Sequence, residues 1–360
     1  MTIGLLIILA LVLFLPFTVK LVEHNLEYFL FIMGLSAAII TGSLSMHTLL
    51  EIIGNPLLYF ITLAVLVAGL LFTVLVNKVK IGISAITEKL PFPLFVFLVI
   101  VVLGLASSII TAIIASLVLV EIINVLPVKQ NAKLRMAVVA CFSIGLGATL
   151  TPVGEPLATI TITKLNADFW YLLDLLGVYI IPGILLLGVF GAFFVKRDPP
   201  LQKYGNDPEL ITDFSKERCV SDQKEGVRIN ATDLKEVFIR AFKIFIFIIA
   251  LDLLGTGFKP LIDIYVVSLD STLLYWINLI SAVLDNATLA AAEISPAMSA
   301  VQVKAILMGL LISGGMLIPG NIPNIVAASK LKIKSRDWAK IGIPIGLTIM
   351  TVYFTIIFLF

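Results

Sequence analysis

Two carboxylates stand inside otherwise apolar stretches of the chain and are the residues best suited to chemistry. Asp285 lies within Ser-Ala-Val-Leu-Asp-Asn-Ala-Thr at 281–288, and Glu155 lies within Gly-Ala-Thr-Leu-Thr-Pro-Val-Gly-Glu-Pro at 147–156. A charge in the middle of a membrane segment costs at least about 2.5–3.5 kcal/mol, so each acid requires a cation, a proton or a polar partner. We therefore expect Asp285 and Glu155 to bind Na⁺ or H⁺.

Neutral oxygen-bearing side chains accompany both acids and suit a hard cation such as Na⁺. Glycines beside them would admit a close approach of the backbone. Two structural alternatives stay open: Asp285 as a protonated or hydrogen-bonded structural residue, and Glu155 as the N-cap of a following helix. The further candidate site residues are Asn286, Thr288, Thr149, Thr151, Gly154, Thr111, Ser107, Asn321, Asn324 and Gly320.

The stretch around Glu155 occurs a second time at residues 315–323. The prolines at 152 and 156 align with those at 319 and 323 at the same spacing. Prolines with neighbouring glycines cannot continue an α-helix, so each copy predicts a helix that stops, runs extended and restarts. Paired interruptions in two halves of an apolar chain point to the binding site of a transporter.

Composition places the chain in a membrane. Of its 360 residues, 60% are hydrophobic and only 13% are charged, against about 45–50% apolar residues in soluble domains. The mean hydropathy is +1.11. We expect an all-α polytopic membrane protein. The sequence contains no phosphate-binding loop, nucleophile elbow or metal-spaced His/Cys cluster, so we expect no enzymatic activity, no cofactor and no nucleic-acid partner.

The apolar segments predict two related halves joined by a polar linker. The first of two hairpins has arms of about 15 residues and the second is shorter; both are short for spans of about 20, so we expect them to be re-entrant. Residues 45–56 read as a loop, 234–254 as a span and 258–269 as a separate amphipathic piece. The predicted parts are a scaffold of two helices (1–56), repeat one (57–195, with hairpin 92–126 and broken helix 136–163), the linker (196–233) and repeat two (234–360, with hairpin 271–294 and broken helix 303–329).

Basic residues orient this arrangement. With these spans, 22 of the 25 Lys and Arg residues fall on the side of the linker, and only Lys164, Lys259 and Lys304 fall on the other. The positive-inside rule makes the linker cytoplasmic and places both termini outside. Repeat one follows two spans and repeat two follows five, so the repeats enter from opposite sides. We therefore expect inverted-topology repeats, the architecture of alternating-access transporters.

The remaining membrane acids are weaker candidates. Glu121 and Glu293 end their hairpins, where we expect them to reach the interface. Asp174 and Asp252 occur in identical Leu-Asp-Leu-Leu-Gly strings, but at non-equivalent places in the two repeats. With these spans no Lys or Arg falls in the membrane interior, so two acids there favour a cation over an anion.

These motifs resemble those of the ion transporter superfamily, which includes NhaD-type Na⁺/H⁺ antiporters, arsenite permeases and divalent-anion/Na⁺ symporters. Ser-Ala-Val-Leu-Asp-Asn at 281–286 looks like the hairpin tips of that group, and Thr-Pro-Val-Gly-Glu-Pro at 151–156 looks like its helix break. The chain is most similar to a compact family of uncharacterised cation transporters of archaea and bacteria, the DUF1646-like proteins. The resemblance implies a homodimer in a prokaryotic cell membrane, with a scaffold and a moving transport part. The first hairpin departs from the pattern, since Ile110-Thr111-Ala112 replaces the usual Ser-Asn-Thr or Ser-Asn-Asp.

The sequence thus favours a secondary transporter that exchanges Na⁺, or Li⁺, for H⁺. Cation and proton would compete for the buried carboxylates, and an ion gradient would supply the energy. The alternative is a Na⁺-coupled transporter of a small anion, a dicarboxylate or an oxyanion, held at the N-termini of the half-helices.

Overall fold

The computed structural model describes residues 2–19, 21–22, 25–56, 58–59, 62–63, 66–67, 70, 90–126, 128–195, 231–283 and 286–359. Within these ranges the regular structure is helical and contains no strand. The predicted third span (57–77) and the linker (196–233) fall largely outside the described residues, as does Asp285.

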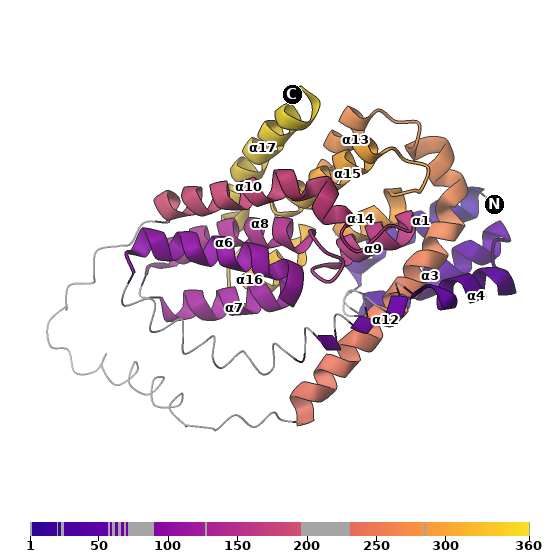
Figure 1. The fold of residues 1–360 in the computed structure, drawn as a ribbon, viewed down its shortest axis with the longest axis horizontal. Helices are drawn as coiled ribbons and strands as arrows, with labels where there is room; N and C mark the ends of the chain where they lie inside the picture. The colour runs from indigo at the N-terminus through magenta and orange to yellow at the C-terminus, as the bar shows by residue number, and fades with distance from the viewer. Residues whose placement is uncertain are drawn as a thin grey trace, which may run out of the picture.

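The helices follow the order of the predicted segments (Figure 1). In the first half they are α1 (Thr2–Thr18), α3 (Leu26–Thr41), α4 (Met46–Gly54), α6 (Phe92–Ile110), α7 (Ala112–Val125), α8 (Gln130–Ala148), α9 (Pro156–Leu165) and α10 (Tyr171–Phe194). In the second half they are α12 (Ala231–Leu261), α13 (Ser271–Ile277), α14 (Asn286–Glu293), α15 (Ala300–Gly314), α16 (Ile322–Lys330) and α17 (Ser335–Phe358), with short 3₁₀ turns at Asn278–Ala282 and Ile318–Gly320.

Helices α6, α7, α8 and α10 lie side by side and form the bundle that holds the first break (Figure 1). Small residues let their backbones approach closely. A Cβ added to Gly147 of α8 would lie 1.8 Å from the carbonyl oxygen of Gly104 on α6. Ser143 of α8 donates a hydrogen bond to the carbonyl oxygen of Ile100, at 2.9 Å. Close packing through Gly and Ser is typical of helix interfaces in membranes, where there is no hydrophobic drive between helices.

A second group pairs the N-terminal helices with the long helix α12. Helix α12 packs along α3. A Cβ on Gly34 of α3 would lie 2.7 Å from the carbonyl oxygen of Ala250. Near one end of the pair, Lys243 and Glu27 form an ion pair at 3.4 Å. Helix α12 also contacts α9 and α14, so this group adjoins the elements that carry the breaks.

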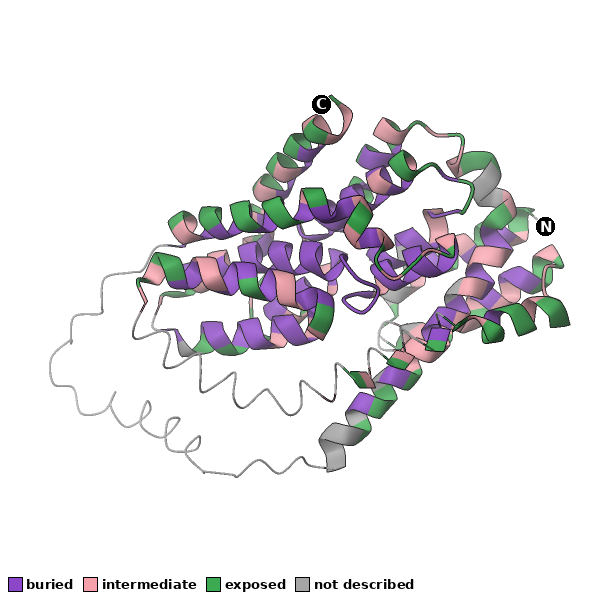
Figure 2. Cartoon of the chain, viewed as in Figure 1, coloured by how far each residue is buried: buried purple, intermediate pink, exposed green. Residues whose placement is uncertain are grey.

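Three helices in the described part of the chain are long and apolar enough to cross a membrane: α6, α10 and α17. Apolar side chains lie on the outer face of α10, where Phe193 is 76% exposed and Val178 is 71% exposed. Figure 2 shows this pattern, with exposed residues on the outer helix faces and buried residues in the bundle centre. Such apolar outer faces are compatible with insertion into lipid.

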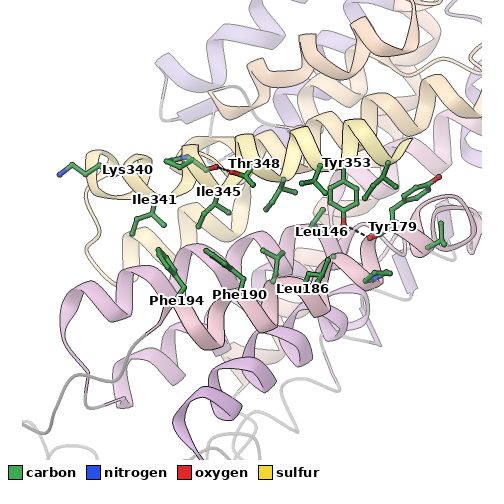
Figure 3. Close-up of a pocket in the computed structure, with 18 residues that line it drawn as sticks. Leu146, Tyr179, Leu186, Phe190, Phe194, Lys340, Ile341, Ile345, Thr348 and Tyr353 are labelled. Carbon is green, nitrogen blue, oxygen red and sulfur yellow. Dashed lines mark hydrogen bonds between the residues drawn. The ribbon is translucent and has the colours of Figure 1, made fainter. Parts of the chain in front are cut away.

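An apolar cavity of about 620 Å³ lies between α10 and α17 (Figure 3). Its lining includes Leu186, Phe190 and Ile345, with Lys340 at one end. The hydroxyl of Tyr353 donates to the carbonyl oxygen of Tyr179 at 2.8 Å and joins the two helices. None of the candidate site residues lines this cavity.

The structure corrects two predicted boundaries. Helix α12 does not end near residue 254 but continues to Leu261, and a π-helical turn follows at Ile262–Val266. Residues 46–54, expected to be part of a loop, form helix α4, which Ser45 caps by accepting a hydrogen bond from the backbone N–H of Thr48. Glycine in this part of α12 serves close packing: a Cβ on Gly257 would lie 2.6 Å from the Cβ of Ala37.

Candidate functional site

Both duplicated stretches interrupt a helix. Residues 149–155 separate α8 from α9, and residues 315–321 separate α15 from α16. The backbone groups freed by the breaks have partners within the protein. Trp338 Nε1 donates to the carbonyl oxygen of Gly315 at 3.3 Å. The hydroxyl of Thr159 donates to the carbonyl oxygen of Pro152 at 2.6 Å. Internal pairing of this kind is what an irregular segment needs if it lies at membrane depth.

Glu155 and Asn321 occupy the same position in the two breaks. Each is the N-cap residue of the following half-helix, with φ/ψ of −154°/159° for Glu155 and −151°/147° for Asn321. The sequence alignment on the prolines pairs Glu155 with Ile322. The pairing by backbone position, Glu155 with Asn321, differs from that alignment by one residue. Pro156 is accordingly the first residue of α9, whereas Pro323 is the second residue of α16.

The Glu155 side chain is buried, at 3% exposure, and points back toward α8. One of its carboxylate oxygens accepts a short hydrogen bond from the hydroxyl of Thr149. The same hydroxyl lies 3.3 Å from the carbonyl oxygen of Gly145. Glu155 is thus the N-cap residue of α9, as the structural alternative predicted, but its side chain makes no capping hydrogen bond to that helix.

Asn321 reaches the same turn of α8 from the second half of the chain. A Cβ on Gly145 would lie 2.6 Å from Asn321 Nδ2, so only glycine leaves room for this approach. The C-terminal turn of α8, from Gly145 to Thr149, therefore lies between Asn321 and Glu155. The acid of one break and the amide of the other thus approach the same turn of α8.

Two side-chain oxygens in the second break are buried without a hydrogen-bond donor. They are Oδ1 of Asn321 and Oδ1 of Asn324, whose side chains are at most 1% exposed. The Nδ2 of Asn324 donates to the carbonyl oxygens of Gly314 at 2.9 Å and Leu317 at 2.8 Å, which fixes the orientation of this amide. Buried acceptors are costly when unpartnered, and a cation is one partner that satisfies them.

The tip of the first hairpin contacts the first break. Thr111, between α6 and α7, has φ of 77°, a rare and strained conformation for a β-branched residue that is found mainly at functional sites. The backbone N–H of Ala112 donates to the carbonyl oxygen of Gly154 at 2.8 Å. The hydroxyl of Thr151 donates to the carbonyl oxygen of Ser108. A Cβ on Gly154 would collide with the carbonyl oxygen of Ala148 at 1.9 Å, so this position requires glycine.

Matched serines join each hairpin to its broken helix. Ser107 donates to the carbonyl oxygen of Ile144 on α8 at 3.0 Å, and Ser281 donates to that of Leu310 on α15 at 3.3 Å. Gly320 completes the second contact, since a Cβ there would lie 2.5 Å from the carbonyl oxygen of Ser281. Ser107 therefore donates its hydroxyl proton to helix packing, and its oxygen keeps lone pairs that can accept a donor or a cation.

The second hairpin tip is described in part. Asp285 lies outside the described residues, and the Thr288 side chain is not described. Asn286 is buried at 3% exposure, and its Nδ2 has no hydrogen-bond partner. Helix α14, which starts at Asn286, packs against α9, while α7 packs against α16. Each hairpin thereby contacts the half-helix of the other repeat.

Comparison with known protein families identifies the family of this chain. A family profile described as "Protein of unknown function (DUF1646)" matches residues 2–360. The chain belongs to this family. No curated protein matches the sequence.

The structure of this DUF1646 protein corrects the prediction that no basic residue lies in the interior. Lys164, expected in a loop, belongs to α9 and is only 8% exposed. Asp252 of α12 and Glu293 of α14 are the carboxylates that act on it electrostatically. Glu293, expected to reach the membrane interface, is half-buried in the protein and accepts a hydrogen bond from Asn278 Nδ2 at 2.8 Å. Sequence reasoning missed this cluster because its three residues lie on three separate segments.

The candidate site does not resemble a transition-metal centre. Among the described residues, no group of three or more His, Cys, Asp or Glu side chains could hold a metal ion. The donors near Glu155 are one carboxylate, hydroxyls and amide oxygens. Oxygen donors of this kind suit Na⁺ or Li⁺ and, through the carboxylate, a proton.

Proposed function

We propose that this protein is a polytopic secondary transporter that exchanges Na⁺, or Li⁺, for H⁺ by alternating access. The observation that carries the proposal is the approach of Glu155 and Asn321 to one turn of α8, together with the unpartnered buried oxygens of Asn321 and Asn324 in the second half. A buried carboxylate with neutral oxygens binds either a small cation or a proton, and this competition is sufficient for exchange.

Inverted repeats are part of the proposal. Their support is the paired hydrogen bonds of Ser107 and Ser281 and the equal backbone conformations of Glu155 and Asn321. Helix α7 of the first hairpin packs against α16 of the second half, and α14 of the second hairpin packs against α9 of the first half. These reciprocal contacts are what two related repeats would make. The spacing from Ser107 to Thr111 equals that from Ser281 to Asp285. Asp285 would therefore complete the site from the second hairpin.

The transport part would consist of the hairpins and broken helices, and α1, α3 and α12 would form the scaffold. We further propose a homodimer in a prokaryotic cell membrane, with the linker (196–233) in the cytoplasm and both termini outside. The lipid-compatible outer face of α10 supports membrane insertion. The orientation rests on the distribution of Lys and Arg.

Na⁺-coupled transport of a small anion is the second candidate. The half-helices α9 and α16 both begin without a side-chain capping bond, so their N-terminal amides are available to an anion. The buried Lys164 does not strengthen this candidate, because it lies at the opposite end of α9 from those amides.

A transport assay separates these candidates. Purified protein is placed in liposomes that contain a pH-sensitive dye, a proton gradient is imposed, and Na⁺, Li⁺, K⁺ and succinate are added in turn. We expect Na⁺ or Li⁺ to move protons, and we expect this response to disappear in Asp285→Asn and Glu155→Gln. Asp174→Asn, at an exposed position of α10, is the matched control and should behave as wild type.

Either of two results would contradict the proposal. Exchange that persists in a correctly folded Asp285→Asn variant would remove the role of that residue. No response to cations alone, together with Na⁺-dependent uptake of succinate, would move the function to symport and the site to the half-helix N-termini.

A further inference from the structure

Lys164 is buried at the C-terminal end of two helices. It lies in the last turn of α9, and its Nζ donates to the carbonyl oxygens of Ala291 and of Ile294, the latter at 3.1 Å. These carbonyls end α14, where the helix dipole is negative and an ammonium group is stabilised. A Cβ on Gly255 of α12 would lie 3.1 Å from Lys164 Cε, so this glycine leaves room for the lysine chain.

Two carboxylates share this environment with the lysine. Asp252 comes from α12 and Glu293 from α14. With all three groups ionised the cluster carries a net charge of −1, and one added proton makes it neutral. Because a net charge is costly in a buried environment, such a cluster favours binding of one proton, which belongs to the group as a whole.

A cavity connects the cluster with the surface. It has a volume of about 250 Å³ and is lined by Lys164, Asp252 and Thr163, and by Lys259 at its exposed end. At about 30 Å³ per molecule, this volume is large enough for several waters. The hydroxyl of Thr163 is buried, lines the cavity and has no hydrogen-bond partner. A polar, roomy cavity of this kind is suited to water that delivers protons.

The charged groups around the cavity come from elements with different roles. In the part of the chain that the structure describes, Lys164 on α9 and Asp252 and Lys259 on α12 line it, and Glu293 on α14 acts on Lys164 electrostatically without lining the cavity. Helix α9 also carries Glu155 at its other end, nine residues and about 13 Å away along the axis. Helix α12 packs on α3 in the proposed scaffold. The cluster therefore bridges the proposed moving and static parts, away from the cation site.

We propose that Lys164, Asp252 and Glu293 form a proton-binding site of the exchange cycle, separate from the cation site at Glu155. A carboxylate of the pair takes one proton from cavity water and becomes a carboxylic acid. Motion of α9 relative to α12 changes the distance between Lys164 and Asp252: separation favours proton uptake, and approach of the ammonium group favours the ionised carboxylate and returns the proton to cavity water. This inference rests on the proposed exchange function, because it adds a second proton-binding site to the carboxylates at which cation and proton compete.

The first test requires no Na⁺. Infrared difference spectra of the purified protein, recorded as the pH is lowered, report the carbonyl stretch of a newly protonated carboxylic acid. We expect a band that is lost or strongly reduced in Glu293→Gln or Asp252→Asn, both of which preserve side-chain shape. Glu121→Gln, at an exposed acid of α7, is the control and should keep the band. A band unchanged in both cluster variants would overturn the proton site.

The second test asks whether proton binding at this cluster is coupled to Na⁺ binding. Na⁺ is added to wild-type protein in weak buffer containing a pH dye, and the released protons are measured. We expect Glu293→Gln and Lys164→Met to bind Na⁺ but to release fewer protons for each Na⁺ bound than wild type, whereas Lys304→Met releases as many. Proton release equal to wild type in the cluster variants would overturn the coupling. Wild-type protein that shows the acid band but does not bind Na⁺ would instead refute the proposed exchange and leave the proton site standing.

Discussion

Glu155 and Asn321 take the same backbone conformation at the start of two half-helices, yet one carries a carboxylate and the other an amide. Their side chains approach the same turn of α8, at Thr149 and Gly145 respectively. The backbone conformation at this position therefore occurs in both breaks, whereas the side chain differs. One negative charge from the first break and neutral oxygens from the second suit a monovalent cation that competes with a proton.

Replacing Thr149 should weaken cation binding. Its hydroxyl donates to the Glu155 carboxylate, and a hydrogen bond to a charged group contributes about 1.5–3 kcal/mol, or roughly 10–100-fold in affinity. We expect Thr149→Val to raise the Na⁺ concentration for half-maximal exchange in liposomes by up to this factor, and Thr149→Ser to restore it. Thr161→Val is the control, because that buried hydroxyl bonds only within α9, to Leu157. An equal effect of both valine variants would contradict the role of Thr149.

Gly147→Ala should damage the fold. The new methyl would lie 1.8 Å from the carbonyl oxygen of Gly104, a backbone atom that cannot move without displacing α6 from α8. Overpacking of this kind costs about 1–3 kcal/mol and occasionally more. We expect a lower thermal unfolding temperature in detergent, or loss of folded protein. Gly54→Ala, where a Cβ would meet nothing within 4 Å, should unfold as wild type does; equal stability of the two variants would refute this packing.

The two tryptophans that follow the breaks should differ sharply. Trp338 is fully buried and donates to the carbonyl oxygen freed at Gly315, whereas Trp170 is 57% exposed. Trp338→Phe leaves that carbonyl unpartnered, which costs about 1–3 kcal/mol. We expect thermal unfolding to shift downward for Trp338→Phe and hardly at all for Trp170→Phe. The opposite order would show that Trp338 does not support the second break.

Ser107→Ala and Ser281→Ala should have similar, modest effects. Each removes one hydrogen bond between a hairpin and a broken helix, and such bonds between membrane helices average about 0.6 kcal/mol. Thermal unfolding of the two variants should shift by comparable amounts, with Ser36→Ala, whose hydroxyl bonds only within α3, close to wild type. A large effect of one serine and none of the other would argue against equivalent packing in the two halves.

Local chemistry made the breaks predictable. Proline and glycine stop a helix wherever they occur, so residues 149–155 and 315–321 were found from the sequence, as was the turn at Thr111 between α6 and α7. These features depend on residues close together in the chain.

Tertiary packing decided the rest. The glycines at 255 and 257 do not end α12, because packing against Lys164 and Ala37 uses their small size while the helix continues. Lys164 is buried because α9, α12 and α14 converge around it, and no periodicity within one segment reveals that convergence. Sequence determined where the helices break, since this is local; the structure alone decided which charges share the interior, since burial depends on contacts between distant segments.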